Sequence, residues 1–85
     1  MNHSEMTKHI RGRVKAAGIK ARVYKDVSCG SEVIVVAVPN AETTFSDDEQ
    51  YEIALIGLCN NLSYVRNTPI LPYAFTKPQQ FNFYL

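Results

Sequence analysis

Residues 28–39 read SCGSEVIVVAVP, and this stretch decides the fold. Gly30 and the flanking serines are typical of a tight turn, because glycine adopts positive φ at no steric cost. The apolar run after the turn is rich in β-branched residues, which favour a strand, and Pro39 closes it. On the other side of the turn, residues 19–27 (IKARVYKDV) alternate between apolar and polar side chains. The stretch therefore predicts an antiparallel β-hairpin.

The second strand of this hairpin carries apolar side chains on both of its faces. Alternation divides them into two sets, which are Val33, Val35 and Ala37 on one face and Ile34, Val36 and Val38 on the other. Helices can cover only one face of a small sheet, and an apolar side chain left in water forgoes about 1.5–3 kcal/mol. We therefore expect the second set to be a candidate apolar interface, covered either by another protein chain or by the apolar tail residues Ile70, Leu71, Tyr73 and Phe75.

An amphipathic helix is predicted before the hairpin. Ser4 is a suitable N-cap for this helix, and Gly18 is a suitable residue to end it. Its apolar positions recur every three or four residues, as one face of a helix requires, and they are Met6, Ile10, Val14 and Ala17.

A second helix is predicted after the hairpin, where residues 46–49 (SDDE) form a capping box. Ser46 caps the first turn, Glu49 bonds back to it, and the acidic residues of this turn favour the positive end of the helix dipole. The predicted apolar stripe of the helix consists of Tyr51, Ala54, Leu55, Leu58 and Leu62. Residues 64–67 (YVRN) are expected to fray beyond its end.

The last predicted strand is residues 80–85, QFNFYL, in which apolar and polar side chains alternate. Prolines at 69, 72 and 78 leave the segment before it extended or looped. The element order is then α-β-β-α-β within one domain of residues 1–85. This order predicts an α+β fold of two layers, with the helices on one face of a small antiparallel or mixed sheet.

Size and composition limit the class of function. The chain has 85 residues, of which 46% are apolar and 20% charged, and this fits one ordinary globular domain rather than a disordered chain. No apolar stretch approaches the roughly 20 residues that span a bilayer, and the N-terminal residues lack the apolar core of a signal peptide. We therefore expect a soluble, cytoplasmic protein with no membrane partner.

The two cysteines, Cys29 and Cys59, are expected to be unrelated reduced thiols. They lie far apart in the sequence, and a zinc site would also need His3 or His9 at no recognised spacing. Neither a nucleotide-binding glycine pattern nor a metalloprotease motif occurs in the sequence. We expect no metal, no cofactor, no catalytic residue and no enzymatic activity, the alternative being an enzyme that uses Cys29 as its nucleophile.

Charge is divided along the chain although its sum is only +1. Residues 8–25 hold seven basic and no acidic residues, whereas residues 26–52 hold seven acidic and no basic residues. A basic face can contact phosphates, and an acidic face can contact a basic protein surface. The candidate partner-binding residues are Lys8, Arg11, Lys15 and Arg22 for the basic contact, and Glu42, Asp47, Asp48 and Glu52 for the acidic contact. The alternative is that the two segments pack together and neutralise each other.

The span from Ile10 to Val38 resembles a small domain family associated with the large polyvalent proteins of phages and plasmids. The matching features are a basic helix, GIK at 18–20, RVY at 22–24 and SCGSEVIV at 28–35. The family has Phe-Pro before the glycine where this chain has Ala16 and Ala17. The resemblance implies a protein of a mobile element that binds host machinery, as anti-CRISPR and anti-restriction proteins do.

These features together predict a non-enzymatic binding protein of phage or plasmid origin. We expect it to inhibit a host defence complex by steric and electrostatic occlusion, in the manner of an anti-CRISPR protein. Its expected partner is a protein, either a host complex or a second copy of the chain. The alternative is a small nucleic-acid-binding module that uses the basic N-terminal helix and the first strand.

Overall fold

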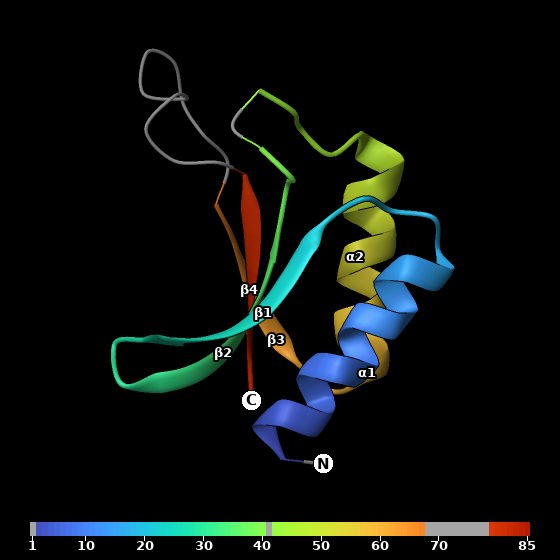
Figure 1. Cartoon of the computed structure of the whole chain (residues 1–85). Coiled ribbons are helices and arrows are strands. Elements are labelled where there is room, and N and C mark those ends of the chain that lie inside the picture. Colours follow the sequence, from blue (N-terminus) through green and yellow to red (C-terminus); the bar gives the residue numbers. More distant parts are fainter. Residues whose placement is uncertain (1, 41, 68–78) are drawn as a thin grey trace.

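Six elements follow one another along the chain, of which two are helices and four are strands. The computed structural model describes residues 2–40, 42–67 and 79–85. The elements are α1 (His3–Ala16), β1 (Arg22–Ser28), β2 (Ser31–Ala37), α2 (Asp47–Cys59), β3 (Ser63–Asn67) and β4 (Gln80–Tyr84). Both helices lie on the same side of one antiparallel sheet, whose strand order is β1-β2-β4-β3 (Figure 1). The prediction of a two-layer α+β fold is confirmed, with one more strand than expected.

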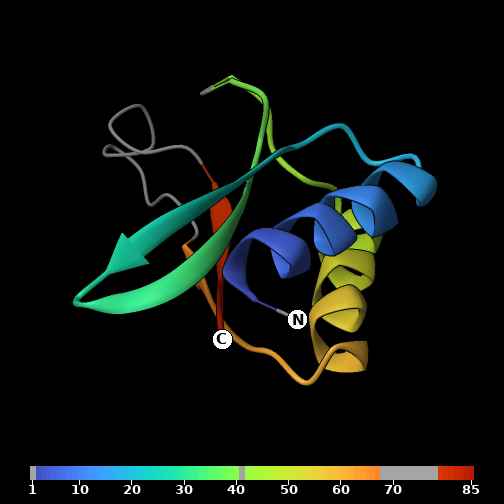
Figure 2. The same cartoon turned by 60° about the horizontal axis from the view of Figure 1, so that its bottom comes forward.

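The central hairpin has the predicted form. β1 and β2 pair antiparallel, and Ser28 is the partner of Ser31 across a two-residue turn. Cys29 and Gly30 have φ of 51° and 81° in this turn, which is the conformation of a type I′ connection. The tip of the hairpin projects away from the helices, as Figures 1 and 2 show from two directions. Cys29 therefore has a structural position in the turn between β1 and β2.

The N-cap of α1 lies two residues before the predicted cap. The side chain of Asn2, not that of Ser4, accepts the backbone N–H of Glu5, at 2.8 Å. Ser4 instead accepts a hydrogen bond from Lys25 Nζ at 3.0 Å. The helix ends before Gly18, whose φ of 76° confirms the predicted stop.

The predicted start of α2 is confirmed, but its predicted buried face is wrong at two of its five positions. Glu49 N–H donates to Ser46 Oγ at 3.1 Å, and Ser46 N–H donates to Glu49 Oε1 at 2.9 Å, which completes the capping box. Tyr51 and Leu58, from the predicted apolar stripe, are 65% and 59% exposed.

Gly57 explains the orientation of α2. A Cβ at this position would overlap the ring of Phe83, so the helix lies against the sheet through its glycine. The buried positions next to Gly57 are Ile53 and Ile56. A face centred on Gly57 turns the two larger side chains, Tyr51 and Leu58, toward solvent.

The sequence does not predict β3, because it indicates a fraying end after α2. The helix instead ends sharply at Asn61, whose φ is 59°. Leu62 N–H donates to the Gly57 carbonyl at 2.9 Å, and Asn61 N–H donates to the Leu58 carbonyl at 3.1 Å. This is the Schellman arrangement, and it redirects the chain into an extended strand beside β4.

The core lies between the sheet and the helices. Ile34, Val36 and Val38 are fully buried in it, together with Ile10 of α1 and Ile53 of α2. The prediction that Ile34, Val36 and Val38 form an apolar interface is therefore wrong. The register of β2 with β4 explains why this face is buried. Phe83 is opposite Ile34, and Phe81 is opposite Val36, so the large rings of β4 lie on the same face of the sheet as these residues. The helices cover this face.

The opposite face of β2 is also buried. Val33, Val35 and Ala37 form a second, smaller cluster there, and the half-buried rings of Tyr24 and Tyr84 pack against it. The prediction that both faces of β2 need cover is confirmed, and residues of the neighbouring strands contribute to that cover. The tail residues predicted to cover a face, Ile70, Leu71, Tyr73 and Phe75, lie outside the described residues.

Candidate interaction surfaces

β1 forms one edge of the sheet. Because a two-residue turn makes Ser28 and Ser31 a hydrogen-bonded pair, alternation makes Asp26–Val33 and Tyr24–Val35 hydrogen-bonded pairs as well. The backbone N–H and C=O groups of the intervening residues of β1 therefore point away from the sheet. These residues are Val23, Lys25 and Val27.

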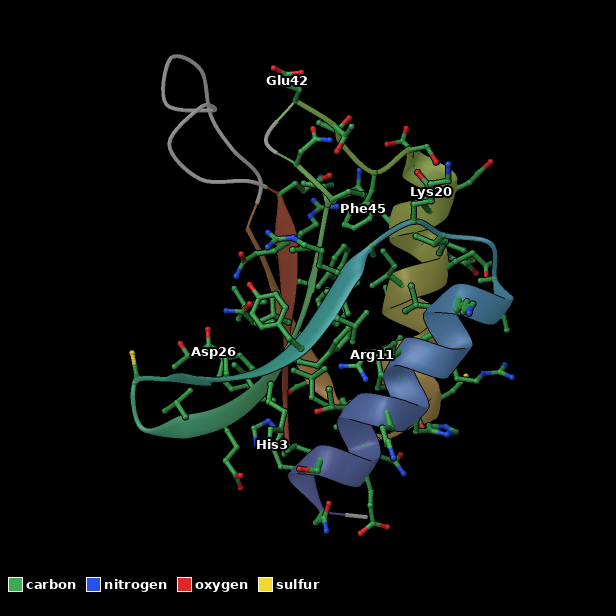
Figure 3. All side chains as sticks on the ribbon, in the orientation of Figure 1. His3, Arg11, Lys20, Asp26, Glu42 and Phe45 are labelled. Carbon is green, nitrogen blue, oxygen red and sulfur yellow. The ribbon has the colours of Figure 1, made fainter. Side chains whose placement is uncertain are left out.

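Side chains occupy part of this edge. Arg11 of α1 donates from both Nε and Nη2 to the Val23 carbonyl, at 3.2 and 2.8 Å. Val27 N–H donates to the side-chain Oδ1 of Asp26 at 2.8 Å. Figure 3 shows Arg11 between α1 and β1. The β1 edge is thus protected against pairing with a further strand, as isolated edges in soluble proteins commonly are.

Basic side chains gather beside the same edge. A groove of about 320 Å³ runs between α1 and β1, and Lys8, Arg11 and Lys25 line it together with Asn2, Ser4, Glu5 and Thr7. We call this the basic groove. It contains two of the four predicted basic contact residues, Lys8 and Arg11. The other two lie elsewhere: Arg22 stacks on the Tyr24 ring at 5.8 Å, and Lys15 is an exposed residue near the end of α1.

The predicted acidic residues lie at the start of α2 and in the loop before it. Glu42, Asp47, Asp48 and Glu52 are all exposed, and we call them the acidic group. Figure 3 shows Glu42 at the opposite end of the molecule from His3. Asp47 lines a hollow on the β3 side of α2, whereas Glu52 lines a hollow on the α1 side that also contains Arg13. Three of the four residues therefore lie in the first two turns of α2, Glu42 lies in the loop before it, and the group does not all face one direction.

The basic and acidic segments do not pair with each other in the described part of the chain. Within residues 2–40, 42–67 and 79–85, the only contact under 4.0 Å between a basic nitrogen and a carboxylate oxygen joins His3 Nδ1 to Glu32 Oε2, at 2.8 Å. His3 Nε2 lies 2.7 Å from the Val33 carbonyl oxygen, so this contact joins α1 to β2. The carboxylates of the acidic group carry no such partner among these residues.

β3 forms the other edge of the sheet, and the hydrogen bonds of β4 show which of its groups point outward. Val38 N–H donates to the Gln79 carbonyl at 3.1 Å, and Leu85 N–H donates to the Glu32 carbonyl at 3.5 Å. Odd-numbered residues of β4 therefore bond to β2, and its even-numbered residues bond to β3. On β3 the partners of those even-numbered residues are Ser63, Val65 and Asn67.

The outward backbone groups of β3 therefore belong to Tyr64 and Arg66. Among the described residues no hydrogen bond reaches these N–H and C=O groups. The Arg66 side chain is held apart from them, because its Nη1 donates to Gln50 Oε1 of α2 at 2.6 Å. In the described chain the β3 edge thus has no counterpart of the Arg11 contact.

Exposed apolar side chains gather at this second edge. A hollow of about 340 Å³ lies between α2 and β3, and its lining is Asp47, Gln50, Tyr51, Ala54, Tyr64, Arg66 and Phe81. Val65 beside it is 58% exposed. Leu58 continues the line of Asp47, Tyr51 and Ala54 along α2, three to four residues apart. We call Tyr51, Leu58, Tyr64, Val65 and Arg66 the β3 edge surface. The sequence does not predict this surface, because the apolar periodicity of α2 places Tyr51 and Leu58 in the core.

Neither thiol belongs to a cluster. Cys29 and Cys59 are free and exposed. In the part of the chain that the structure describes, no group of three or more His, Cys, Asp and Glu side chains is placed to hold a metal ion. The helices of that part are too short and too polar to cross a membrane.

Comparisons with known proteins add no relative. No protein-family model matches the chain, and no curated protein and no solved structure matches it. The resemblance to phage and plasmid domains therefore stays a prediction.

Proposed function

We propose that this chain is a non-enzymatic binding protein of phage or plasmid origin that inhibits a host defence complex by occupying one of its surfaces. The observation that supports the proposal is the unpaired charge of the acidic group. Its four carboxylates are exposed, and no cationic side chain of the described residues lies within 4.0 Å of them. Such carboxylates remain available to a partner.

The mechanism we propose is competition for a basic surface. A complex that holds nucleic acid presents arginines and lysines, and exposed carboxylates on a small rigid domain are attracted to the same positions. The capping box fixes the first turn of α2, so Asp47 and Asp48 are presented on an ordered element. The bound domain then excludes the nucleic acid sterically.

The test is the efficiency with which phages form plaques on bacteria that carry an active restriction or CRISPR system. Expression of the chain should raise this efficiency against at least one such system. The triple variant Glu42→Gln, Asp48→Asn and Glu52→Gln should lose the effect while remaining folded. Glu5→Gln is the matched control, because it removes an exposed carboxylate from α1 and should leave the effect unchanged. Plaque formation equal to that of the empty vector on every host would contradict the proposal.

A second candidate function is binding to nucleic acid through the basic groove. Lys8, Arg11 and Lys25 line the same groove, and their positive charge suits phosphate. Arg11 is already bonded to the Val23 carbonyl, so the two lysines would carry most of the contact. Fluorescence anisotropy with a DNA duplex tests this function. Affinity should fall as salt rises, and Lys8→Gln should reduce the salt slope by about 1. Affinity that is independent of salt would exclude it.

A further inference from the structure

We propose that β3 pairs antiparallel with β3 of a second copy of the chain, about a two-fold axis that passes beside Val65. The two sheets then form one continuous sheet with the four helices on one face. This inference uses a surface outside the basic groove and most of the acidic group, so it can fail while the proposed function holds.

The backbone supplies the first argument. Tyr64 and Arg66 direct their N–H and C=O groups away from β4, and the described residues leave these groups without a protein partner. An edge strand with free backbone groups and exposed apolar side chains is a template for another strand. The β1 edge is different, because Arg11 occupies its Val23 carbonyl and Asp26 occupies its Val27 N–H.

The register of the pairing follows from the side chains. A residue whose backbone groups point outward must pair with a residue of the other copy whose backbone groups also point outward. Three registers meet this condition. They pair Tyr64 with Tyr64, Arg66 with Arg66, or Tyr64 with Arg66. The pairing of Arg66 with Arg66 brings like charges together, which is destabilising. The pairing of Tyr64 with Tyr64 would place Arg66 opposite Leu62, which is buried and lies before the strand begins.

The remaining register pairs Tyr64 of each copy with Arg66 of the other. Every outward backbone group of both residues is then bonded across the axis. On the helix side, each guanidinium lies next to a tyrosine ring, an arrangement that favours cation–π contact. On the other side, the two exposed Val65 side chains meet at the axis and bury each other.

α2 extends the same contact. Tyr51 and Leu58 lie on the stripe of α2 that runs beside β3, and both are exposed. Because the helices of both copies lie on the same face of the joined sheet, these stripes approach each other across the axis. Apolar side chains that α2 leaves exposed in one copy thus gain cover from the other.

Charge also favours a second copy at this edge. The hollow beside β3 contains one carboxylate, Asp47, and one guanidinium, Arg66, so two copies bring balanced charges together. Self-association through β1 would instead bring together the basic grooves, which hold three cations and one carboxylate each.

The first experiment measures mass in solution by light scattering and sedimentation. The chain of 9.6 kDa should give twice that mass. Arg66→Pro should give a monomer that remains folded, because proline removes an outward N–H and leaves the bonds to β4 intact. Val27→Pro, which removes an outward N–H from the β1 edge instead, is the control and should remain dimeric. A wild-type monomer at all concentrations up to about 1 mM overturns the proposal, and so does a dimer that Arg66→Pro leaves unchanged.

The second experiment locates the axis by disulfide formation. In a background of Cys29→Ser and Cys59→Ser, Val65→Cys should give a dimer on a non-reducing gel, because non-hydrogen-bonded partners of antiparallel strands lie about 4.5 Å apart at Cα. Val27→Cys is the matched control, since Val27 is 64% exposed on the β1 edge. Cross-linking of Val65→Cys should be faster by about tenfold or more. Equal rates, or cross-linking of Val65→Cys only to a different protein, overturn the proposal.

Discussion

The two edge strands of the sheet, β1 and β3, differ in whether side chains bond to their outward backbone groups. On β1, Arg11 reaches across from α1 to the Val23 carbonyl, and Asp26 holds the Val27 N–H. On β3, Tyr64 and Arg66 direct their backbone groups outward, and none of the described residues bonds to them. The side chains differ as well, since cations line the groove at β1, whereas tyrosines line the hollow at β3.

This difference separates two roles. A protected edge with surrounding cations resists further strand pairing and keeps its charge available for a charged partner. An open edge with exposed apolar side chains loses solvent-exposed surface when another strand joins it. The β1 side therefore suits electrostatic contact, and the β3 side suits strand pairing.

The largest effect is expected from a substitution that displaces α2, because this helix supplies Tyr51 and Leu58 to the β3 edge surface. Gly57→Val places a branched side chain where the Phe83 ring lies, in a core that cannot yield without displacing the helix. Overpacking of this kind should lower the free energy of unfolding by about 3 kcal/mol. Urea denaturation followed by circular dichroism measures this loss.

Gly12→Ala is the control for Gly57→Val. Gly12 also lies within a helix, but nothing is close to the position of its Cβ. Alanine there should raise the free energy of unfolding by up to about 1 kcal/mol through helix propensity alone. If both substitutions changed stability in the same direction, the explanation for the orientation of α2 would be wrong.

The next test opens the β1 edge. Arg11→Ala removes a charged donor that makes two hydrogen bonds to one carbonyl, and it should cost about 2 kcal/mol in unfolding free energy. The freed edge should also increase light scattering at high protein concentration. Arg13→Ala, at an exposed arginine two residues further along α1, should change stability by less than about 0.5 kcal/mol. No difference between these two variants would show that Arg11 does not protect the edge.

A smaller effect is expected where α2 turns into β3. Asn61 has a φ of 59°, a conformation that costs most side chains about 1–2 kcal/mol. Asn61→Ala should therefore lower the free energy of unfolding by about 1 kcal/mol, and Asn61→Gly should not lower it. Chemical denaturation of the pair measures both. A loss in the glycine variant would mean that the Asn61 side chain, rather than its backbone, stabilises the end of the helix.

The elements that could be predicted from sequence are those that depend on neighbouring residues. The hairpin follows from Gly30 and the apolar run beside it, and the capping box follows from Ser46 and Glu49. The Asn60–Asn61 pair was a usable signal for a sharp helix end, because asparagine tolerates positive φ. The prediction of a fraying terminus leaves this signal unused, and it therefore contains no β3.

The features that could not be predicted depend on contacts between distant residues. The buried face of α2 is decided by Gly57 meeting Phe83, and the covered face of β2 is decided by its register with β4. The β3 edge surface consists partly of backbone groups, whose direction is unknown until the register is known. Arg11 is predicted as a basic contact residue, and its bond to the Val23 carbonyl could not be foreseen for the same reason.

The smallest effect is expected from the second protecting group of β1. Asp26→Ala frees the Val27 N–H at an exposed position and should cost only about 0.5 kcal/mol in unfolding free energy. Asp26→Asn keeps an oxygen that can accept this N–H and should lie closer to the wild type. Because Arg11 still holds the Val23 carbonyl, Asp26→Ala alone should increase scattering less than Arg11→Ala, and the double variant should increase it most. If Asp26→Ala scatters as strongly as the double variant, then Val27 rather than Val23 limits strand pairing at β1.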